Sequence, residues 1–246
     1  MIERVLMPVY QTRLKTRADV AERTMAFQLE KPSGFQFKPG QYLDLTLIDP
    51  PQMDSQGAVR TLSIASAPYE DDLLVATRLR DSAFKRLIMT LPLGTELKFE
   101  GPMGSFTLHK NSAKAAVFLA GGIGITPFRS IVRQAIKEKF PHQLYLFYCN
   151  RRPEDAAFLD ELPDLSQSTP HFIFVPSMTE MEKSKRKWSA ECGFINREML
   201  VKHFCDLNGP IYYVAGPPAM VVAMQQMLIK AGVCEDDIRT EEFGGY

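Results

Sequence analysis

The sequence lacks the features that mark a membrane protein or a general nucleic-acid binder. No apolar run approaches the roughly 18 consecutive residues that a membrane-spanning helix needs, and the start, Met1-Ile2-Glu3-Arg4, has no apolar segment like that of a signal peptide. The 29 basic and 29 acidic side chains give a formal net charge of +0, which argues against nucleic-acid and membrane-surface partners. We therefore expect a cytoplasmic protein without a membrane span.

Cysteine and histidine are scarce and scattered. The four cysteines form no C-x-x-C pair and do not have the C-x₄-C-x₂-C spacing of a plant-type iron–sulfur cluster. The four histidines show no metal-ligand pair at helical or hairpin spacing. The sequence therefore predicts free thiols and no metal site. The residues in question are Cys149, Cys192, Cys205, Cys234, His109, His142, His171 and His203.

The length and the first half of the chain predict a small β domain. A chain of 246 residues with 45% hydrophobic and 24% charged side chains fits a soluble protein of one large domain or two small ones. Leucines alternate with polar residues over positions 43–47, and further strands are expected at 73–79 and 95–100. A helix is expected at 82–90, with Ser82 as its cap. We predict an antiparallel β-barrel domain over residues 1–109.

The second half predicts an α/β domain over residues 110–246, because strands and helices alternate there. A last helix follows Gly216, carries a methionine-rich apolar stripe typical of core packing, and ends at Gly232. Such an alternation predicts a parallel sheet. The other expected strands are 115–119, 144–149, 172–175 and 211–215, and the other expected helices are 127–140, 154–162 and 197–204.

A glycine-rich turn is the strongest chemical signal in the chain. It reads Gly121-Gly122-Ile123-Gly124-Ile125-Thr126-Pro127, with Pro127 expected at the first position of the helix. Glycines let an anion approach the backbone, and the helix N-terminus offers free N–H groups, so the turn is typical of a diphosphate site. A tight turn without a ligand is the alternative. The G-x-G-x-x-G fingerprint lacks its third glycine, and the next strand ends in Asn150-Arg151-Arg152 rather than in an acid.

Three other stretches are candidates for ligand contact. Gly216-Pro217-Pro218 follows a strand, so it lies with the glycine turn at the carboxyl edge of the sheet. The stretch 60–68 carries an arginine and hydroxyl groups that either hold phosphate and a polar ring edge or form an exposed strand face. Residues 101–106 either contact a ligand or form a turn that closes the barrel.

Taken in order, these pieces resemble the flavin and nicotinamide domains of the ferredoxin–NADP⁺ reductase superfamily, over nearly the whole chain. The resemblance implies a barrel that binds FAD, with FMN as the alternative. It also implies an α/β domain that takes NAD(P)H as substrate. The motifs are Arg60-x-Leu62-Ser63, Gly101-x-x-Gly104-x-Phe106, Gly121-Gly122-x-Gly124-x-Thr126-Pro127, Ala215-Gly216-Pro217-Pro218 and Glu241-Glu242-Phe243-Gly244-Gly245-Tyr246.

The resemblance also implies roles for single residues in the β half. Arg60 would bind flavin phosphate, and Ser82 would meet the phosphates at the start of its helix. Ser63 would hydrogen-bond near flavin N5 as a catalytic residue. The other residues expected to line the flavin are Thr61, Leu62, Ala76, Thr77 and Arg78.

In the α/β half the resemblance implies contacts to the nicotinamide dinucleotide. Phe243 or Tyr246 would shield the flavin until nicotinamide displaces it. Glu242 is a candidate catalytic residue that balances charge or protons, the alternative being a solvated acid beside Glu241. The residues expected to bind the diphosphate and the nicotinamide are Gly121, Gly122, Gly124, Ile125, Thr126, Pro127, Gly216, Pro217, Pro218 and Met220.

Several positions depart from the family pattern. Leu62 stands where Tyr or Phe is usual, so we expect weaker stacking on the flavin, and Ala215 stands where Cys is frequent. We expect no linked iron–sulfur domain like that of many relatives. Arg151 is placed to meet the 2′-phosphate of NADP, whereas Ser177-Met178 replaces the Ser-Arg of NADP-specific relatives. The choice between NAD and NADP stays open.

Three functions fit these observations. The first is a flavin-dependent NAD(P)H oxidoreductase, expected to be a monomer, that passes electrons to a separate acceptor such as ferredoxin, flavodoxin or an oxygenase component. The second is a flavin reductase that uses flavin as a diffusible substrate, which a weakly stacking Leu62 favours. The third is an electron-transfer subunit of a larger complex without NAD(P)H turnover of its own.

Overall fold

Alternating apolar residues fold the first half of the chain into a closed antiparallel sheet. The structure, a computed structural model, describes residues 8–244. A bridge between Ile64 and Val75 joins the edge strands β4 and β5, so the predicted barrel is confirmed. The six strands lie in the order β4-β3-β6-β1-β2-β5, and they are β1 (Val9–Ala21), β2 (Thr24–Glu30), β3 (Tyr42–Leu47), β4 (Val59–Ser63), β5 (Asp72–Arg78) and β6 (Glu96–Met103).

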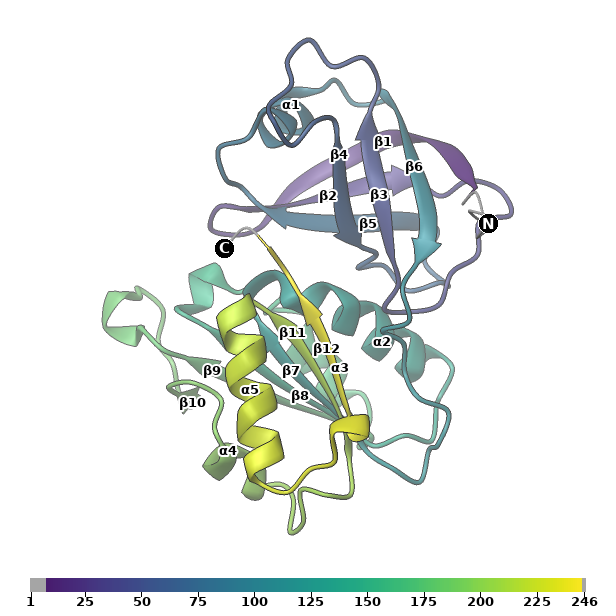
Figure 1. Cartoon of the computed structure of the whole chain (residues 1–246). Helices are drawn as coiled ribbons and strands as arrows, with labels where there is room; N and C mark the ends of the chain where they lie inside the picture. Colours follow the sequence, from purple (N-terminus) through teal and green to yellow (C-terminus); the bar gives the residue numbers. More distant parts are fainter. Residues whose placement is uncertain (1–7, 245–246) are drawn as a thin grey trace.

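Helix α1 (Ala83–Thr90) begins where the sequence predicts. Ser82 is its N-cap, and the Ser82 Oγ accepts a hydrogen bond from the Lys85 N–H at 3.2 Å. Phe84 and Ile88 on this helix are buried in the barrel core, where they join the alternating leucines of β3. The helix is thereby held against the barrel (Figure 1).

The second half forms a parallel sheet, as predicted. Its central strands β7 and β11 are buried on both faces, which explains their uninterrupted apolar sequences. In Figure 1 this domain lies below the barrel. The strand order is β10-β9-β8-β7-β11-β12, with β7 (Ala116–Gly121), β8 (Leu144–Asn150), β9 (Phe172–Met178), β10 (Glu191–Cys192), β11 (Ile211–Gly216) and β12 (Ile238–Glu242).

Helices cover both faces of this sheet. Helices α2 (Ile125–Lys137) and α3 (Leu162–Gln167) pack against one face, in a core that includes Phe118. Helices α4 (Arg197–Val201) and α5 (Pro218–Lys230) pack against the other face, in a core that includes Leu119. Alternate residues of one strand thus serve two cores.

Three helix predictions need correction. The helix expected at 154–162 is absent: Pro153–Asp155 is a single 3₁₀ turn, and Phe158 has a φ of +59°, which is incompatible with a right-handed helix. Helix α2 begins at Ile125, so Pro127 is its third residue rather than its first, and it ends at Lys137. Helix α4 ends at Val201 instead of 204. Strand β12 was not predicted, since its sequence is mostly polar.

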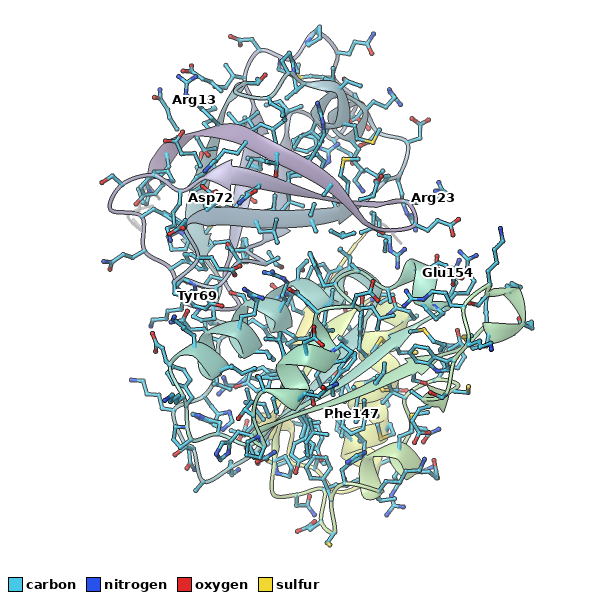
Figure 2. All side chains as sticks on the ribbon, turned by 180° about the vertical axis from the view of Figure 1, so that it is seen from behind. Arg13, Arg23, Tyr69, Asp72, Phe147 and Glu154 are labelled. Carbon is cyan, nitrogen blue, oxygen red and sulfur yellow. The ribbon has the colours of Figure 1, made fainter. Side chains whose placement is uncertain are left out.

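Helix α2 docks on the barrel through buried polar groups. Arg129 Nη1 donates to the Ala65 carbonyl at 2.8 Å, and Ser130 Oγ donates to the Ser66 carbonyl at 2.6 Å. Figure 2 shows Tyr69 of the barrel beside this helix. These contacts fix the orientation of the two domains.

The connection between the domains adds apolar contacts. It runs from the end of β6 to the start of β7, and the predicted boundary at 109/110 falls within it. Phe106 in this connection is buried, with its ring 5.7 Å from that of Phe128 on α2. The stretch 101–106 therefore joins the domains. At the other end of the interface the Glu22 N–H donates to the Glu154 carbonyl at 2.7 Å.

Candidate functional site

Two glycine-containing turns meet at the switch point of the parallel sheet. The chain leaves β7 toward β8 on one side, whereas β11 pairs with β7 on the other side, so the strand order reverses there. A Cβ placed on Gly124 would lie 2.2 Å from the Ala215 carbonyl oxygen, and one on Gly216 would lie 3.2 Å from Gly121 backbone atoms. Only glycine allows this close approach of the two turns.

A cleft of about 550 Å³ opens above these turns, between the two domains. Its floor is formed by the carboxyl ends of the parallel strands, and its opposite wall by the end of β5 and the turn after β1. Four arginines and two acids line it, which gives a positive field suited to a diphosphate. The charged lining residues are Arg23, Arg78, Arg80, Arg151, Glu22 and Asp155.

The structure divides the residues predicted to hold the dinucleotide into two groups. One group lines the cleft: Gly121, Gly122, Arg151, Pro217 and Met220, beside Arg78, which was predicted to line the flavin. The other group shapes the turns: Gly124, Ile125, Thr126 and Pro127 are buried, the Thr126 hydroxyl donates to the Ile123 carbonyl at 3.0 Å, and Pro218 begins α5. Side chains in the second group therefore act on a ligand only through the turn that they hold.

The predicted flavin-phosphate site already holds an anion. Arg60 Nη2 lies 3.4 Å from Asp54 Oδ1, and Asp54 Oδ2 accepts the Ala83 N–H at the start of α1, at 2.7 Å. The Ala83 N–H and, to a smaller extent, Arg60 lower the pKa of Asp54. The Asp54 carboxylate thus stands in for a phosphate between a guanidinium and a helix N-terminus.

The residues predicted around the flavin ring are only partly brought together. Ser63 is 6% exposed, and its Oγ makes no hydrogen bond within residues 8–244. The Ile64–Val75 bridge places Ser63 beside the buried Ala76 of β5, and Thr77 follows on that strand. Strand β5 in turn contacts the glycine turn of the α/β domain.

Three other residues predicted around the flavin have partners elsewhere. The Thr61 hydroxyl donates to Asp44 Oδ1 at 2.5 Å, so it is engaged on the outer side of β4. Leu62 packs against the barrel core. Arg78 Nη2 donates to the Asp155 carbonyl at 2.9 Å and so bridges the two domains.

The last strand ends at the domain junction (Figure 1). The Phe243 N–H donates to the Gly216 carbonyl at 3.0 Å, which ties the predicted shielding residue to the second turn. Tyr246 lies outside the described residues. Glu242 is exposed, whereas Glu241, which pairs with Ala215 in register, is half-buried. Its Oε2 is buried without a hydrogen-bond partner among residues 8–244, and burial raises the pKa of Glu241 to about 7.

Replacing Glu241 with glutamine is expected to remove a pH-dependent cost to stability. Because its folded-state pKa is raised, the folded protein binds more protons than the unfolded chain between about pH 4.5 and 7. The free energy of unfolding of the wild type therefore falls as the pH rises through this window. The Glu241→Gln variant should gain roughly 2–3 kcal/mol relative to wild type between about pH 5 and 8.

Urea unfolding at about pH 5 and at about pH 8 measures this gain, and Glu242→Gln is the matched control. Glu242 is exposed on the same strand, so its replacement should give the same difference from wild type at both pH values. Equal pH dependence for the two variants would contradict the assignment of Glu241 as the buried acid.

No group of three or more His, Cys, Asp or Glu side chains within residues 8–244 is arranged to hold a metal ion. Within the same residues, no helix combines the length and apolar character that crossing a membrane requires.

The α/β half matches a known protein family. Residues 118–226 match the family model described as the oxidoreductase NAD-binding domain. Over 216 residues the chain is 27% identical to the reductase component of propane 2-monooxygenase from Rhodococcus jostii. That match covers 87% of this chain and 57% of the relative, so the chain spans little more than half of the relative's length.

Solved structures share the whole two-domain fold. A cytochrome P450 reductase from Amycolatopsis superposes with a TM-score of 0.82 at 24% identity, over 98% of this chain and 72% of the other. A ferredoxin–NADP⁺ reductase from Neisseria gonorrhoeae, solved with bound FAD and NADP, superposes with a TM-score of 0.79 at 23% identity, over 95% of this chain and 98% of the other. Both domains, in this arrangement, therefore form one known architecture.

Proposed function

We propose that this chain is a flavin-dependent NAD(P)H oxidoreductase of the ferredoxin–NADP⁺ reductase type with a separate electron acceptor, in line with its motifs and its relatives. The observation that carries the proposal is the cleft. It lies at the switch point of the parallel sheet, is lined by arginines, and is closed on its other side by the barrel strand β5. A dinucleotide bound there reaches the barrel.

The residues of the barrel fit a flavin. Arg60 contacts one carboxylate oxygen of Asp54, and the first N–H group of α1 contacts the other. The two groups are therefore arranged for an anion such as the flavin phosphate. The Ser63 side chain lies 6% exposed beside Ala76, and its hydroxyl suits a polar edge of the ring. A flavin bound there would supply the redox chemistry between nicotinamide and the electron acceptor. Glu241 rather than Glu242 would hold a proton near the site.

The floor of the cleft fits the dinucleotide. Gly122 lines the cleft just ahead of the N-terminus of α2, an end that favours a diphosphate. Phe194 lines the same cleft with 75% of its surface exposed, which is unusual for a large apolar side chain and suits stacking on adenine. Pro217 and Met220 lie beside the glycine turn, where the nicotinamide half would extend toward β5.

Charges beside the cleft favour NADH over NADPH. Arg151 was the candidate for a 2′-phosphate, yet its Nε lies 3.9 Å from Glu180 Oε1, so a phosphate bound by Arg151 would have a carboxylate nearby. Met178 is buried and offers no charge. Steady-state rates with NADH and NADPH test this preference, which a faster rate with NADPH would contradict.

The relatives suggest which class of protein accepts the electrons. The reductase component of propane 2-monooxygenase belongs to an oxygenase system, so an oxygenase component or a ferredoxin is the class of acceptor to test first, with flavodoxin next. The balanced charge supports a cytoplasmic protein that acts without nucleic acid, and we propose a monomer.

Desalting after incubation with FAD or FMN separates the three candidate functions. A flavin that stays with the protein supports a resident cofactor, and flavin loss with continued NAD(P)H turnover supports a diffusible substrate. A retained flavin without NAD(P)H turnover would indicate an electron-transfer subunit. Leu62 favours weak retention, since an aliphatic side chain stacks less well than an aromatic one.

Replacing Asp54 with asparagine is expected to tighten FAD binding about three- to tenfold, because a neutral amide competes less well than a carboxylate for Arg60 and the Ala83 N–H. Quenching of flavin fluorescence measures the dissociation constant. Asp81→Asn is the control, since Asp81 is exposed and pairs with Arg86 on the other side of the same helix start. Equal or weaker binding by Asp54→Asn would show that this carboxylate does not compete with flavin.

A further inference from the structure

Asn150 is a buried amide without a partner at the edge of the cleft. It is the last residue of β8, it lines the cleft, and it is 6% exposed. Both its Oδ1 and its Nδ2 are buried, and neither has a hydrogen-bond partner within residues 8–244. Such groups are rare because each loses its bonds to water on folding. A rotation of the side chain into the cleft would break no hydrogen bond, because the amide makes none where it lies.

The order of the strands shows which part of a dinucleotide passes this residue. Gly121 pairs in register with Cys149, so Asn150 lies directly beyond the glycine turn. On the far side of β8, Asn150 pairs with Met178 of β9, and Phe194 lies on the outer part of the same cleft. Across the sheet, the glycine turn therefore comes first, Asn150 next, and the exposed ring of Phe194 last. In a dinucleotide, ribose lies between the diphosphate and the base.

The hydrogen-bonding groups of the Asn150 amide also match a ribose. An amide offers one acceptor and two donors, and a ribose diol both donates and accepts, so it satisfies Oδ1 and Nδ2 together. A phosphate only accepts, so it would leave Oδ1 facing an anion. We infer that Asn150 binds the hydroxyl groups of the adenosine ribose and helps the cleft select an unphosphorylated ribose. This inference rests on the proposed function.

Binding of ADP and of 2′-deoxy-ADP to the whole protein, measured by titration calorimetry, tests the inference without any turnover. Wild type should bind ADP about tenfold more tightly than 2′-deoxy-ADP, as one hydrogen bond to a buried group implies. In the Asn150→Ala variant this discrimination should vanish, since the hydroxyl has lost its partner. Asn111→Ala, at an exposed asparagine outside the cleft, should discriminate as wild type does.

A second variant guards against a merely structural role. Asn150→Leu removes the unsatisfied amide at similar volume, so it should raise the melting temperature of the nucleotide-free protein while weakening ADP binding. If Asn150→Ala keeps the discrimination, or if Asn150→Leu melts lower and binds ADP normally, the inference is wrong, although the proposed function stands. If wild type binds no ADP and also fails to reduce flavin with NAD(P)H, both fall.

Discussion

Replacing Gly124 with alanine is expected to lower the free energy of unfolding by at least about 2–3 kcal/mol and to abolish flavin reduction by NADH. The new Cβ would lie 2.2 Å from the oxygen and 2.5 Å from the carbon of the Ala215 carbonyl, and 2.7 Å from the Gly216 nitrogen. All three are backbone atoms of the adjacent turn, which no side-chain rotation can move away. The two turns must separate, and the diphosphate site is then lost.

Urea unfolding and NADH-dependent flavin bleaching measure the two effects. Gly209→Ala is the matched control, because a Cβ on Gly209 meets nothing within 4 Å. That control should stay within about 1 kcal/mol of wild type and keep its activity. A Gly124→Ala variant that unfolds and turns over like Gly209→Ala would show that the close approach of the turns is not required.

Replacing Arg129 with methionine is expected to cost about 3–5 kcal/mol of stability, the range for breaking a buried ion pair by removing one partner. Arg129 is 6% exposed, and its guanidinium donates to the Ala65 carbonyl of the barrel. It also pairs with Glu161 at 2.5 Å and with Glu70 at 3.3 Å. Without it, Arg133 is the one cation that remains paired with both carboxylates among residues 8–244, and α2 loses its hydrogen bond to the Ala65 carbonyl of the barrel.

The orientation of the domains should loosen as well, so flavin reduction by NADH should slow even where the variant is folded. Denaturant unfolding and stopped-flow absorbance measure the two changes. Arg13→Met is the control, because Arg13 forms an exposed ion pair with Glu96 and should change stability by less than about 1 kcal/mol. Equal losses in the two variants would mean that Arg129 does not hold the domains together.

Features that depend on neighbouring residues in the sequence were predictable. The apolar runs of β7 and β11, the glycines of the two turns and the cap at Ser82 are local signals, and each appears where expected. The helix expected at 154–162 shows the limit of such signals. Glu154 suits a first helical turn, but its carboxylate is used instead by Ser184 and by the Lys185 N–H, far along the chain.

Features that depend on the fold could not be predicted. Glu241 and Glu242 are neighbours of one type, and only the register of β12 against β11 decides which is buried. Asp54 lies in a loop, and nothing in its sequence indicates that it reaches both Arg60 and α1. Phe194 stands in no motif that indicates a ligand site, and only the structure shows it exposed at the cleft.

The central claim is that nicotinamide bound in the α/β half reduces a flavin held by the barrel. The most direct test mixes the protein, loaded with FAD and freed of unbound flavin, with NADH under anaerobic conditions in a stopped-flow spectrometer. The account predicts rapid loss of the visible absorbance of oxidised flavin, saturating with NADH concentration, and no such loss in Gly124→Ala. A protein that binds FAD but keeps its absorbance with either NADH or NADPH, or that binds no flavin, would contradict it.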